Sequence, residues 1–422
     1  MICGTRQVTL NASLICVKKM IELQDYTPIV GQNVIDDLRL LAEKLEGKAI
    51  QNINSTAVGG GVAEILNRLI PLLQELNVDA HWDVIKGGEQ FFEVTKKFHN
   101  ALHGLNEEIR SHDFDIFMEA SSNNIAQTNI YGDIVFVHDP QPIALIKKKG
   151  SNKWIWRCHI DVSNPNRRVW GFLRDFVIKY DAAVFSSPSF SQRLPIRQFL
   201  ISPSIDPLSD KNKELPEDVI NGVLKKYGIT KDKPIIAQIS RFDRLKDPLG
   251  VIAAYKQVKK YNDCQLILAG GGAKDDPEGI KVFEEVKEKA KEDKDIHALL
   301  LPQNDLEVNA LQRAATIIIQ KSLKEGFGLT VTEALWKAKP VVASAVGGIP
   351  LQIKHKYSGL LCHSVDGAAF ALKQLLNSPD YAKKLGDNGR EHVRNNFLLT
   401  RHLKEYMLLF LTLYNDKDMV YL

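Results

Sequence analysis

The most informative part of this chain is the segment KEGFGLTVTE at residues 324–333, where a glycine turn separates Glu325 from Glu333. The apolar run at 316–319 predicts a buried parallel strand before it, and residues 329–337 have helical character. Glu325 is therefore expected at the carboxyl end of the strand and Glu333 in the second turn of the helix. Backbone N–H groups at a helix start are unpaired and partially positive, so they favour a phosphate or sugar oxygen. The segment predicts a binding site for a sugar attached to a nucleotide.

Short apolar runs alternate with helical segments along most of the chain. In the first half, strands are predicted at 49–53, 80–85, 134–138, 154–159 and 182–186, with helices beginning at Val62, Phe91 and Arg167. In the second half, strands are predicted at 235–240, 265–269, 298–301 and 317–320, with helices beginning at Leu249, Lys281 and Val308. This rhythm is typical of parallel sheets covered by helices. The predicted fold class is α/β, with two doubly wound units.

The length of 422 residues and the 44% hydrophobic share suit two domains, each with its own core. Residues 202–210 are rich in proline and turn formers and are the predicted linker. We therefore predict an N-terminal domain at 1–205 and a C-terminal domain at 206–395. Residues 1–30 show little periodicity and are expected to form an arm or extra strand, which could serve dimer contacts.

Composition disfavours several classes of function. The formal charge of +4 comes with lysines spread throughout and no basic patch interleaved with aromatics, which argues against nucleic acid. No apolar run approaches membrane length, and the start of the chain lacks a secretory signal pattern. The apolar run at 406–411 lies in a last helix, within 396–422, that is expected to pack back onto the N-terminal domain rather than anchor in a membrane.

The five cysteines lie far apart and include no CxxC pair. This usage indicates reduced thiols in a cytoplasm, and it argues against a structural zinc site. We therefore expect a soluble cytoplasmic protein.

Open parallel sheets bind ligands beyond the carboxyl ends of their strands. After the first strand comes a triple glycine, in which Gly60 and Gly61 would let the backbone approach a ligand at a helix start. The turn lacks the last glycine of the GxGxxG fingerprint, and no acidic residue of the expected kind follows about twenty residues on. A dinucleotide oxidoreductase is therefore poorly supported, and a plain flexible turn is the alternative interpretation.

Two cations follow the first strand of the second half. Arg241 and Lys246 lie just before a helix for which Asp247 and Pro248 are a good N-cap and first position. Taken alone, they could be solvated surface charge. Their expected position opposite Glu325 favours a role in holding a diphosphate, which gains negative charge as its bond to a sugar breaks. The sequence offers no paired-carboxylate metal motif, so no metal is expected.

This combination of motifs resembles the retaining glycosyltransferases of the GT-B type, which carry an E-x7-E motif, here Glu325 to Glu333. Within that family the chain is most similar to the trehalose glycosyltransferring synthases of archaea and bacteria. The motifs that carry this likeness are Asn54-Ser55-Thr56, Val137-His138-Asp139-Pro140-Gln141-Pro142, Trp156-Arg157-Cys158-His159-Ile160-Asp161, Pro203-Ser204-Ile205-Asp206-Pro207 and Ala345-Val346-Gly347-Gly348-Ile349. The resemblance covers nearly the whole chain, and it implies two Rossmann-like domains facing an interdomain cleft.

The resemblance also implies an activity and its partners. Glucose would pass from a nucleoside diphosphate glucose to free glucose, giving α,α-trehalose with retained configuration, without a metal or other cofactor. The chain would act as a homodimer. Front-face transfer is favoured over a double displacement, because Glu325, the tempting nucleophile, binds hydroxyls in this family.

Roles for single residues follow from the same resemblance. Glu325 would bind hydroxyls of the donor glucose, Glu333 the ribose hydroxyls, and Arg241 with Lys246 the diphosphate. The backbone amides that would cradle sugar and phosphate oxygens are those of Gly326, Phe327, Gly328, Leu329 and Thr330.

The opposite domain would supply Gly60 and Gly61 against the donor. His138 and Asp139 would lie beside the glucosyl group and the acceptor. A buried structural role is the alternative for His138, because it follows an apolar run. Further candidates for the acceptor pocket are Arg157, His159 and Asp161.

The sequence departs from the family pattern near the phosphate loop. Asp247 stands where glycine is more usual, and Lys321 and Pro350 are further deviations. The preferred nucleotide base therefore stays open. Three alternatives also stay open: a retaining trehalose phosphorylase, a related synthase with another acceptor, and a sugar-binding protein that has lost turnover.

Overall fold

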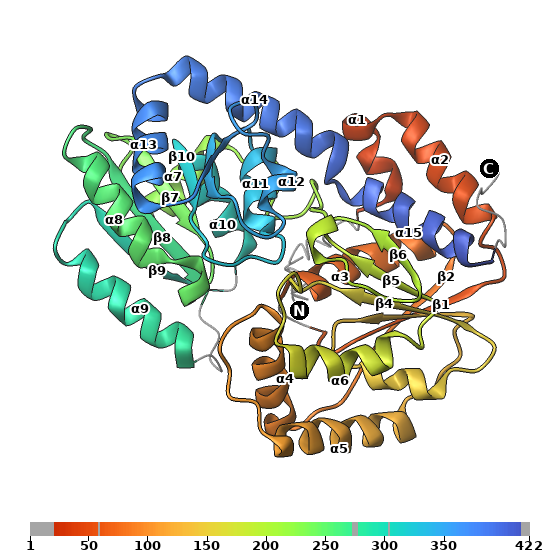
Figure 1. Cartoon of the computed structure of the whole chain (residues 1–422). Coiled ribbons are helices and arrows are strands. Elements are labelled where there is room, and N and C mark those ends of the chain that lie inside the picture. Colours follow the sequence, from red (N-terminus) through yellow and green to blue (C-terminus); the bar gives the residue numbers. More distant parts are fainter. Residues whose placement is uncertain (1–20, 58–59, 272–276, 303, 415–422) are drawn as a thin grey trace, which may run out of the picture.

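The computed structural model describes residues 21–57, 60–271, 277–302 and 304–414. Its two sheets have six strands each, all pairs parallel, and they form the centres of two lobes (Figure 1). The predicted α/β class with two doubly wound units is confirmed. In the described part of the chain, no helix has the length and apolar character needed to cross a membrane.

The first sheet has the strand order β2-β1-β3-β4-β5-β6. Its strands are β1 (Ala49–Asn54), β2 (Asp79–Val84), β3 (Ile134–His138), β4 (Lys153–Cys158), β5 (Ala182–Phe185) and β6 (Arg197–Leu200). The helices around it are α2 (Gln32–Glu43), α3 (Gly60–Glu75), α4 (Glu89–Leu102), α5 (Ser111–Gln127), α6 (Arg167–Val177) and α15 (Leu399–Tyr414), with 3-10 turns η2 (Ile143–Lys148) and η3 (Pro188–Phe190). Neighbouring residues of β3 enter different cores, Val135 on one face and Phe136 on the other, so helices cover both faces.

The second sheet has the order β12-β11-β10-β7-β8-β9. Its strands are β7 (Ile235–Ile239), β8 (Gln265–Gly271), β9 (Ile296–Leu301), β10 (Ile317–Gln320), β11 (Val341–Ser344) and β12 (Leu360–Cys362). Its helices are α7 (Glu217–Lys226), α8 (Pro248–Lys259), α9 (Pro277–Ala290), α10 (Asp305–Ala314), α11 (Leu329–Trp336), α12 (Ile349–Gln352), α13 (Val365–Leu376) and α14 (Pro379–Asn396), with the 3-10 turn η4 (Arg244–Lys246). Strands such as IIAQI in β7 and IIIQ in β10 are fully buried, as parallel strands covered on both faces require.

Strand order tells where each sheet opens for a ligand. The order reverses between β1 and β3 in the first sheet, and between β7 and β10 in the second. Crevices form beyond the carboxyl ends of strands at such reversals. The first sheet has the flavodoxin-like order at this point and the second has the Rossmann order. The segments after β1, β3, β7 and β10 are therefore the ones that can build a site.

The chain crosses between the lobes twice, and the two crossings are bonded to each other. Ile205 donates its N–H to the carbonyl of Phe397 at 2.9 Å and accepts from the N–H of Leu399 at 3.0 Å. The following helix, α15, packs against α2 and α3 of the first lobe, and Figure 1 shows it beside α2. Its residues Met407 and Phe410 are buried in the first core, which covers the apolar run at 406–411. Residues 415–422 lie outside the described chain.

The expected arm or extra strand at 1–30 is wrong over its described part. Residues 23–30 form η1 (Leu23–Tyr26) and α1 (Thr27–Val30) instead. Leu23 and Tyr26 are buried in the first core, and Pro28 near the start of α1 favours a helix. Residues 1–20 lie outside the described chain.

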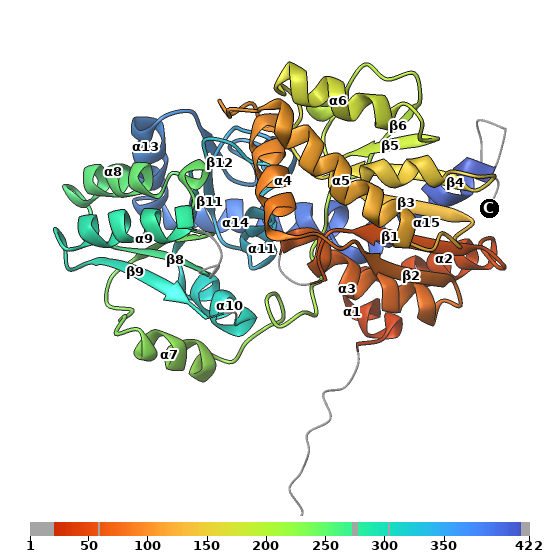
Figure 2. The ribbon, with the colours of Figure 1, turned by 90° about the horizontal axis from the view of Figure 1, so that it is seen from below.

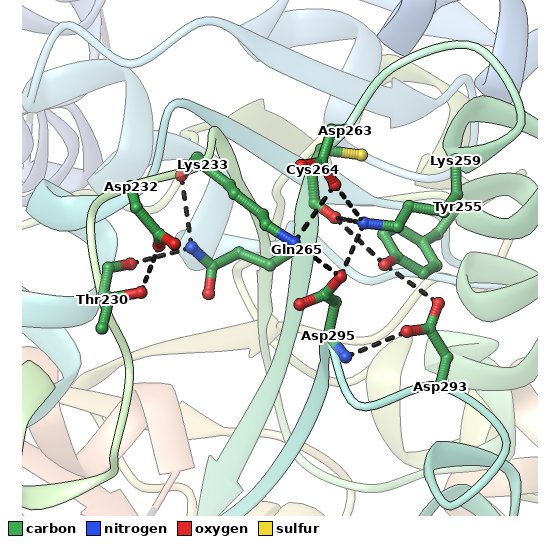
Figure 3. A network of polar contacts seen from close by, with 10 residues as sticks. All are labelled: Thr230, Asp232, Lys233, Tyr255, Lys259, Asp263, Cys264, Gln265, Asp293 and Asp295. Carbon is green, nitrogen blue, oxygen red and sulfur yellow. Dashed lines mark hydrogen bonds and ion pairs between the residues drawn. The ribbon is translucent and has the colours of Figure 1, made fainter.

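A network of charged side chains ties the second sheet together at its amino edge, away from the crevice (Figure 3). Asp295, just before β9, accepts hydrogen bonds from Lys259 at 2.7 Å and Lys233 at 3.0 Å. Lys259 also bonds Asp263 at 2.7 Å, next to the start of β8. The network therefore fixes α8 against the beginnings of β8 and β9.

Candidate active site

The phosphate loop of the second lobe is Ser240 to Pro248, between β7 and α8. Asp243 accepts a hydrogen bond from the N–H of Leu245 at 2.7 Å and so shapes η4. The side chain of Gln238 in β7 donates to the carbonyl of Lys246 at 2.8 Å. These bonds anchor the backbone of Lys246 to its own sheet. The guanidinium of Arg241 stays largely exposed, 3.7 Å from Asp243.

Lys246 and Glu325 meet across the crevice between β7 and β10. The Lys246 ammonium lies 2.7 Å from both carboxylate oxygens of Glu325. Ser322 donates a further hydrogen bond to Glu325 at 3.0 Å. Lys246 and Glu325 both have side chains that are mostly buried, at 16% and 9% exposed, so water screens the pair weakly. The structure thus brings together two of the residues singled out in the sequence.

Tight turns hold the backbone around Glu325. Gly328 is the N-cap of α11 and has φ +84°, a left-handed conformation that favours glycine. A Cβ on Gly347 would lie 1.7 Å from the carbonyl of Glu325, so only glycine fits there. Gly348 donates its N–H to the carbonyl of Gly326 at 2.9 Å. Residues 326–330 therefore form a fixed turn whose last two residues, Leu329 and Thr330, open α11.

Glu333 lies one turn further along α11, buried between the lobes. Its carboxylate accepts a hydrogen bond from Gln312 at 3.0 Å. It lines a cavity of about 260 Å³ together with Leu329 of α11, Glu64 of α3 and Asp206 of the first crossing. Because its lining comes from α3, the first crossing and α11, the cavity lies between the two lobes.

The two sequence deviations at Asp247 and Lys321 contact each other. Asp247 has φ +49°, a left-handed conformation that aspartate tolerates better than most residues, and its carboxylate caps α8 by accepting from the N–H of Gly250 at 3.1 Å. Lys321, at the end of β10, forms an ion pair with the same carboxylate. Asp247 directly follows Lys246 in the chain, and Lys321 lies four residues before Glu325. Aspartate at 247 thus keeps the loop conformation that glycine would adopt.

His138, at the end of β3, is buried and hydrogen-bonded on both ring nitrogens. Its Nδ1 lies 3.2 Å from Nε2 of His159, and its Nε2 lies 3.2 Å from the side-chain oxygen of Asn52. The His138 and His159 rings stack with centroids 5.5 Å apart. Burial, and then the charge of Arg157, lowers the pKa of His138 to about 3, so the ring is neutral. These contacts agree with a buried structural role for His138. Its position at the end of β3, beside the crevice, agrees with a role in the site.

Asp139 and its neighbours continue this edge of the first sheet. Asp139 has φ +65° and accepts a hydrogen bond from the N–H of His159 at 2.8 Å. Burial raises its pKa to about 6, although the His159 amide and the Arg157 charge oppose the shift. Asp161 accepts from the N–H of Ser163 at 2.9 Å. These bonds fix the loop that follows β4.

Arg157 is fully buried beneath the same edge. Its Nη2 donates to the hydroxyl of Ser186 at 3.4 Å, while Nε and Nη1 have no hydrogen-bond partner among the described residues. The positive charge lowers the pKa of the neighbouring His159, after the larger effect of burial. The pKa of His402 is lowered by burial, then by the charge of Arg401 and then by that of Arg157. Arg157 therefore lies behind His138 rather than in the open cleft.

The two crevices face one another. A Cβ on Gly61, at the start of α3, would lie 3.3 Å from the side chain of Leu329, and one on Gly326 would lie 3.0 Å from the carbonyl of His159. Gly60 is the first residue of α3, while Val58 and Gly59 lie outside the described chain. Across the gap, Lys211 of the second lobe bonds Glu64 of α3 at 2.6 Å. Gly61 and His159 of the first lobe thus lie against Leu329 and Gly326 of the second lobe.

The structure adds residues that the sequence analysis did not assign. Ser322 and Gln312 hold the two glutamates, and nothing in their spacing marks them out. His99 and His103 stand at the end of α4 near the phosphate loop, and only their positions in the fold reveal this. In the described part of the chain, no cluster of three or more His, Cys, Asp or Glu side chains could hold a metal ion.

Two family models match the chain. The model described as trehalose synthase, N-terminal domain, matches residues 52–192, and that of glycosyl transferases group 1 matches residues 222–392. A solved α,α-trehalose-phosphate synthase (UDP-forming) from Burkholderia xenovorans shares the fold, with a TM-score of 0.69 at 14% identity over 87% of this chain and 100% of that one. Two parallel sheets with facing crevices and these matches define the class: the protein is a glycosyltransferase with the GT-B fold.

Closer relatives narrow the class. The trehalose synthase of Pyrococcus horikoshii is 44% identical over 398 residues, which cover 92% of this chain and 95% of the relative. The chain belongs to the trehalose synthase family. A trehalose phosphorylase of Grifola frondosa is 30% identical over 88% of this chain, which matches 58% of that longer protein.

Proposed function

We propose that this protein transfers glucose from a nucleoside diphosphate glucose onto free glucose and releases α,α-trehalose. The observation that carries the proposal is the bonded pair of Lys246 and Glu325 at the strand reversal of the second sheet. An ammonium and a carboxylate held side by side suit the two halves of such a donor: the cation attracts the diphosphate and the carboxylate accepts from sugar hydroxyls. Glu333, buried beside the interlobe cavity, would bind the ribose hydroxyls.

The proposed reaction keeps the configuration of the transferred carbon. The bond from C1 of the donor glucose to the diphosphate oxygen breaks, and a bond from C1 to a C1 hydroxyl oxygen of the acceptor forms on the same face. The proton of that hydroxyl passes to the departing phosphate oxygen. Arg241 and Lys246 would stabilise the negative charge that grows on the diphosphate. No step needs a protein nucleophile, so Glu325 is free to orient the glucose.

The acceptor would lie against the first sheet. Asp139 has a raised pKa, so its carboxyl group can exchange hydrogen bonds with uncharged sugar hydroxyls. His138 is neutral, and it would reach a sugar hydroxyl by giving up one of its bonds to His159 or Asn52. His159 and Asp161 belong to the loop that faces Gly326. Arg157 would act from behind by orienting His138 and His159, since it is fully buried. Closure of the two lobes would exclude water from the transfer.

A retaining trehalose phosphorylase is the second candidate, because the Grifola frondosa relative carries that name. It would use glucose 1-phosphate in place of the nucleotide sugar. Isomerisation of maltose is a third route to trehalose. The nucleotide base, metal independence, the homodimer and the cytoplasmic location stay predictions.

The test is to incubate purified protein with glucose and, separately, UDP-glucose, ADP-glucose or glucose 1-phosphate, and also with maltose alone. The sugar product of each reaction is identified by chromatography and NMR. The proposal predicts trehalose from at least one nucleotide sugar, with one nucleoside diphosphate released for each trehalose. Trehalose made only from glucose 1-phosphate would establish the phosphorylase, and trehalose made only from maltose would establish the isomerase.

A further inference from the structure

Helix α4 lies on the side of the first lobe that faces the second lobe (Figure 2), and two histidines stand at its carboxyl end. His99 lies in the last turn and His103 is the C-cap. Their rings meet edge to face with centroids 4.7 Å apart. The proposed reaction does not yet use either of them.

The end of α4 is docked on the loop that follows β4. Asn166 donates its N–H to the carbonyl of Ala101 at 2.8 Å. A Cβ on Gly104 would lie 2.6 Å from the carbonyl of Asn164, which shows how closely the two segments approach. The same loop faces the turn at residues 326–330 of the second lobe, because the carbonyl of His159 lies 3.0 Å from the Cβ position of Gly326. The histidine pair is therefore held at the interlobe site by backbone contacts.

The cations of the phosphate loop act on both rings. The pKa of His103 is lowered to about 4, first by burial and then by the charges of Lys246 and Lys324. The pKa of His99 is lowered to about 3 by burial, by His103 and by Arg241, with Asn100 and Asp243 opposing. Both rings are therefore neutral at physiological pH. The charges that act on the two rings thus include both cations of the phosphate loop, Arg241 and Lys246.

His103 lacks a protein partner for its inner nitrogen. The side chain is 7% exposed, and its Nδ1 is buried without a hydrogen bond to any described residue. Leaving a buried polar atom unpaired costs about 1–3 kcal/mol, so such an atom in a native structure calls for an explanation. A ligand, or a small rotation of the ring toward one, would supply the missing bond.

We propose that His99 and His103 form the wall of the diphosphate site opposite Arg241 and Lys246, and that they bind phosphate oxygens of the nucleotide sugar. The inference rests on the proposed function, because it takes a diphosphate as the ligand. In this proposal the first lobe binds the leaving group directly. Because the two histidines reach the diphosphate when the lobes close, closure also stabilises the leaving group.

Protonation follows from this placement. In the free enzyme burial is the main reason that both imidazoles stay neutral, and the nearby cations lower their pKa further. A bound diphosphate neutralises those cations and attracts a proton to the rings, which raises their pKa. The two rings thus have a low pKa in the free protein and a higher pKa in the complex. At a pH between these two values, the complex holds more protons than the free protein. Donor binding therefore takes up protons, and donor affinity rises as the pH falls from about 8 to about 5.5.

The experiment is calorimetric titration of the full chain with UDP-glucose and with ADP-glucose, without acceptor, at pH 6 and pH 8. Buffers of different ionisation enthalpy report the protons taken up. The diester diphosphate of either ligand has no group that titrates in this range, so the uptake belongs to the protein. The variants are His103→Gln and His99→Gln, and the matched control is His112→Gln, an exposed histidine of α5.

Wild type should take up a measurable fraction of a proton at pH 6. His103→Gln should reduce that uptake and weaken donor binding by about tenfold at pH 6, and by less at pH 8. His99→Gln, which changes a less buried ring, should shift both quantities in the same direction, while the control should match wild type. Donor binding and proton uptake unchanged in both variants would overturn the inference and leave the proposed function intact. Failure of wild type to bind either nucleotide sugar would instead overturn the proposed function.

Discussion

At the scale of single residues, the account depends on the contact between Lys246 and Glu325. The ammonium is 2.7 Å from both carboxylate oxygens, and Ser322 adds a third bond to the carboxylate. These bonds hold both side chains in place until a donor arrives. Donor binding would then replace one charged contact by two, from Lys246 to the diphosphate and from Glu325 to the sugar.

Replacing Lys246 by alanine is expected to lower turnover by about a hundredfold or more, because a fixed cation at the leaving group is lost. Glu325→Gln should reduce turnover by a similar factor, since the amide holds the sugar less firmly. Initial rates at saturating substrates measure both effects. Lys225→Ala, which removes an exposed lysine of α7, is the control and should keep the normal rate. Near-normal turnover in a folded Lys246→Ala protein would remove Lys246 from the site.

At the scale of elements, the phosphate loop shows how two unusual residues compensate for each other. Asp247 adopts a left-handed conformation, caps α8 and pairs with Lys321 from the end of β10. Without Lys321, its carboxylate would stand unpaired beside the position expected for the diphosphate.

Lys321→Met should therefore raise the KM for the nucleotide sugar by about tenfold, because like charges then meet at the loop. Asp247→Gly alone should be tolerated, since glycine adopts a φ of +49° without strain. The double variant should recover a KM within about threefold of wild type. Steady-state kinetics of wild type, the two single variants and the double variant measure the coupling between Asp247 and Lys321. A Lys321→Met enzyme with an unchanged KM would show that the pair has no part in donor binding.

The charged network at the other edge of the second sheet makes a contrasting prediction. Asp295→Asn should lower the free energy of unfolding by about 1–2 kcal/mol and leave turnover unchanged, because its bonds to Lys259 and Lys233 hold only the amino ends of the strands. Those hydrogen bonds, that of Lys259 first, lower the pKa of Asp295 to about 2. The stabilisation is therefore present above about pH 4 and is lost as the pH falls toward 2.

Urea unfolding of wild type and variant between pH 7 and pH 3 checks this prediction. The difference between them should shrink at the acidic end. A loss of activity in a folded Asp295→Asn protein would mean that the network reaches the site.

At the scale of the whole molecule, the side chain of Lys211 links the two lobes at the site. Lys211 bonds Glu64 of α3 at 2.6 Å and lies 3.5 Å from Asp305 of α10. Lys211→Met should loosen closure and admit water, so hydrolysis of the nucleotide sugar relative to transfer should rise by roughly threefold or more. Release of nucleoside diphosphate with and without glucose measures the ratio. Lys213→Met is the control, because Lys213 pairs locally with Asp210; an equal ratio in both variants would contradict the role of the bridge.

Much of the fold could be predicted because buried parallel strands are apolar runs. The predicted strand at 134–138 coincides with β3, and that at 317–320 with β10. Strand β6 was missed, since it is an edge strand of half-exposed and exposed residues with the sequence RQFL. The helical turns at 23–30 were missed because Leu23 and Tyr26 are fixed by long-range packing, including a bond from Tyr26 to Asp206.

The candidate site also has features that the sequence predicts and features that only the folded structure reveals. Glu325 and Lys246 follow strands at a strand reversal, so motif spacing and sheet topology place them together. The stacking of His138 on His159, the burial of Arg157 and the effect of the Lys246 charge on the pKa of His103 depend on tertiary packing. Such contacts join residues far apart in the chain, and no local pattern encodes them.

The most direct test of the central claim is a crystal structure of the protein with a bound nucleoside diphosphate and glucose. The account predicts diphosphate oxygens within about 3 Å of the Arg241 guanidinium and the Lys246 ammonium, between the two lobes. It also predicts that Glu325 contacts the sugar. A diphosphate bound elsewhere, or Arg241 and Lys246 turned away from it, would contradict the account.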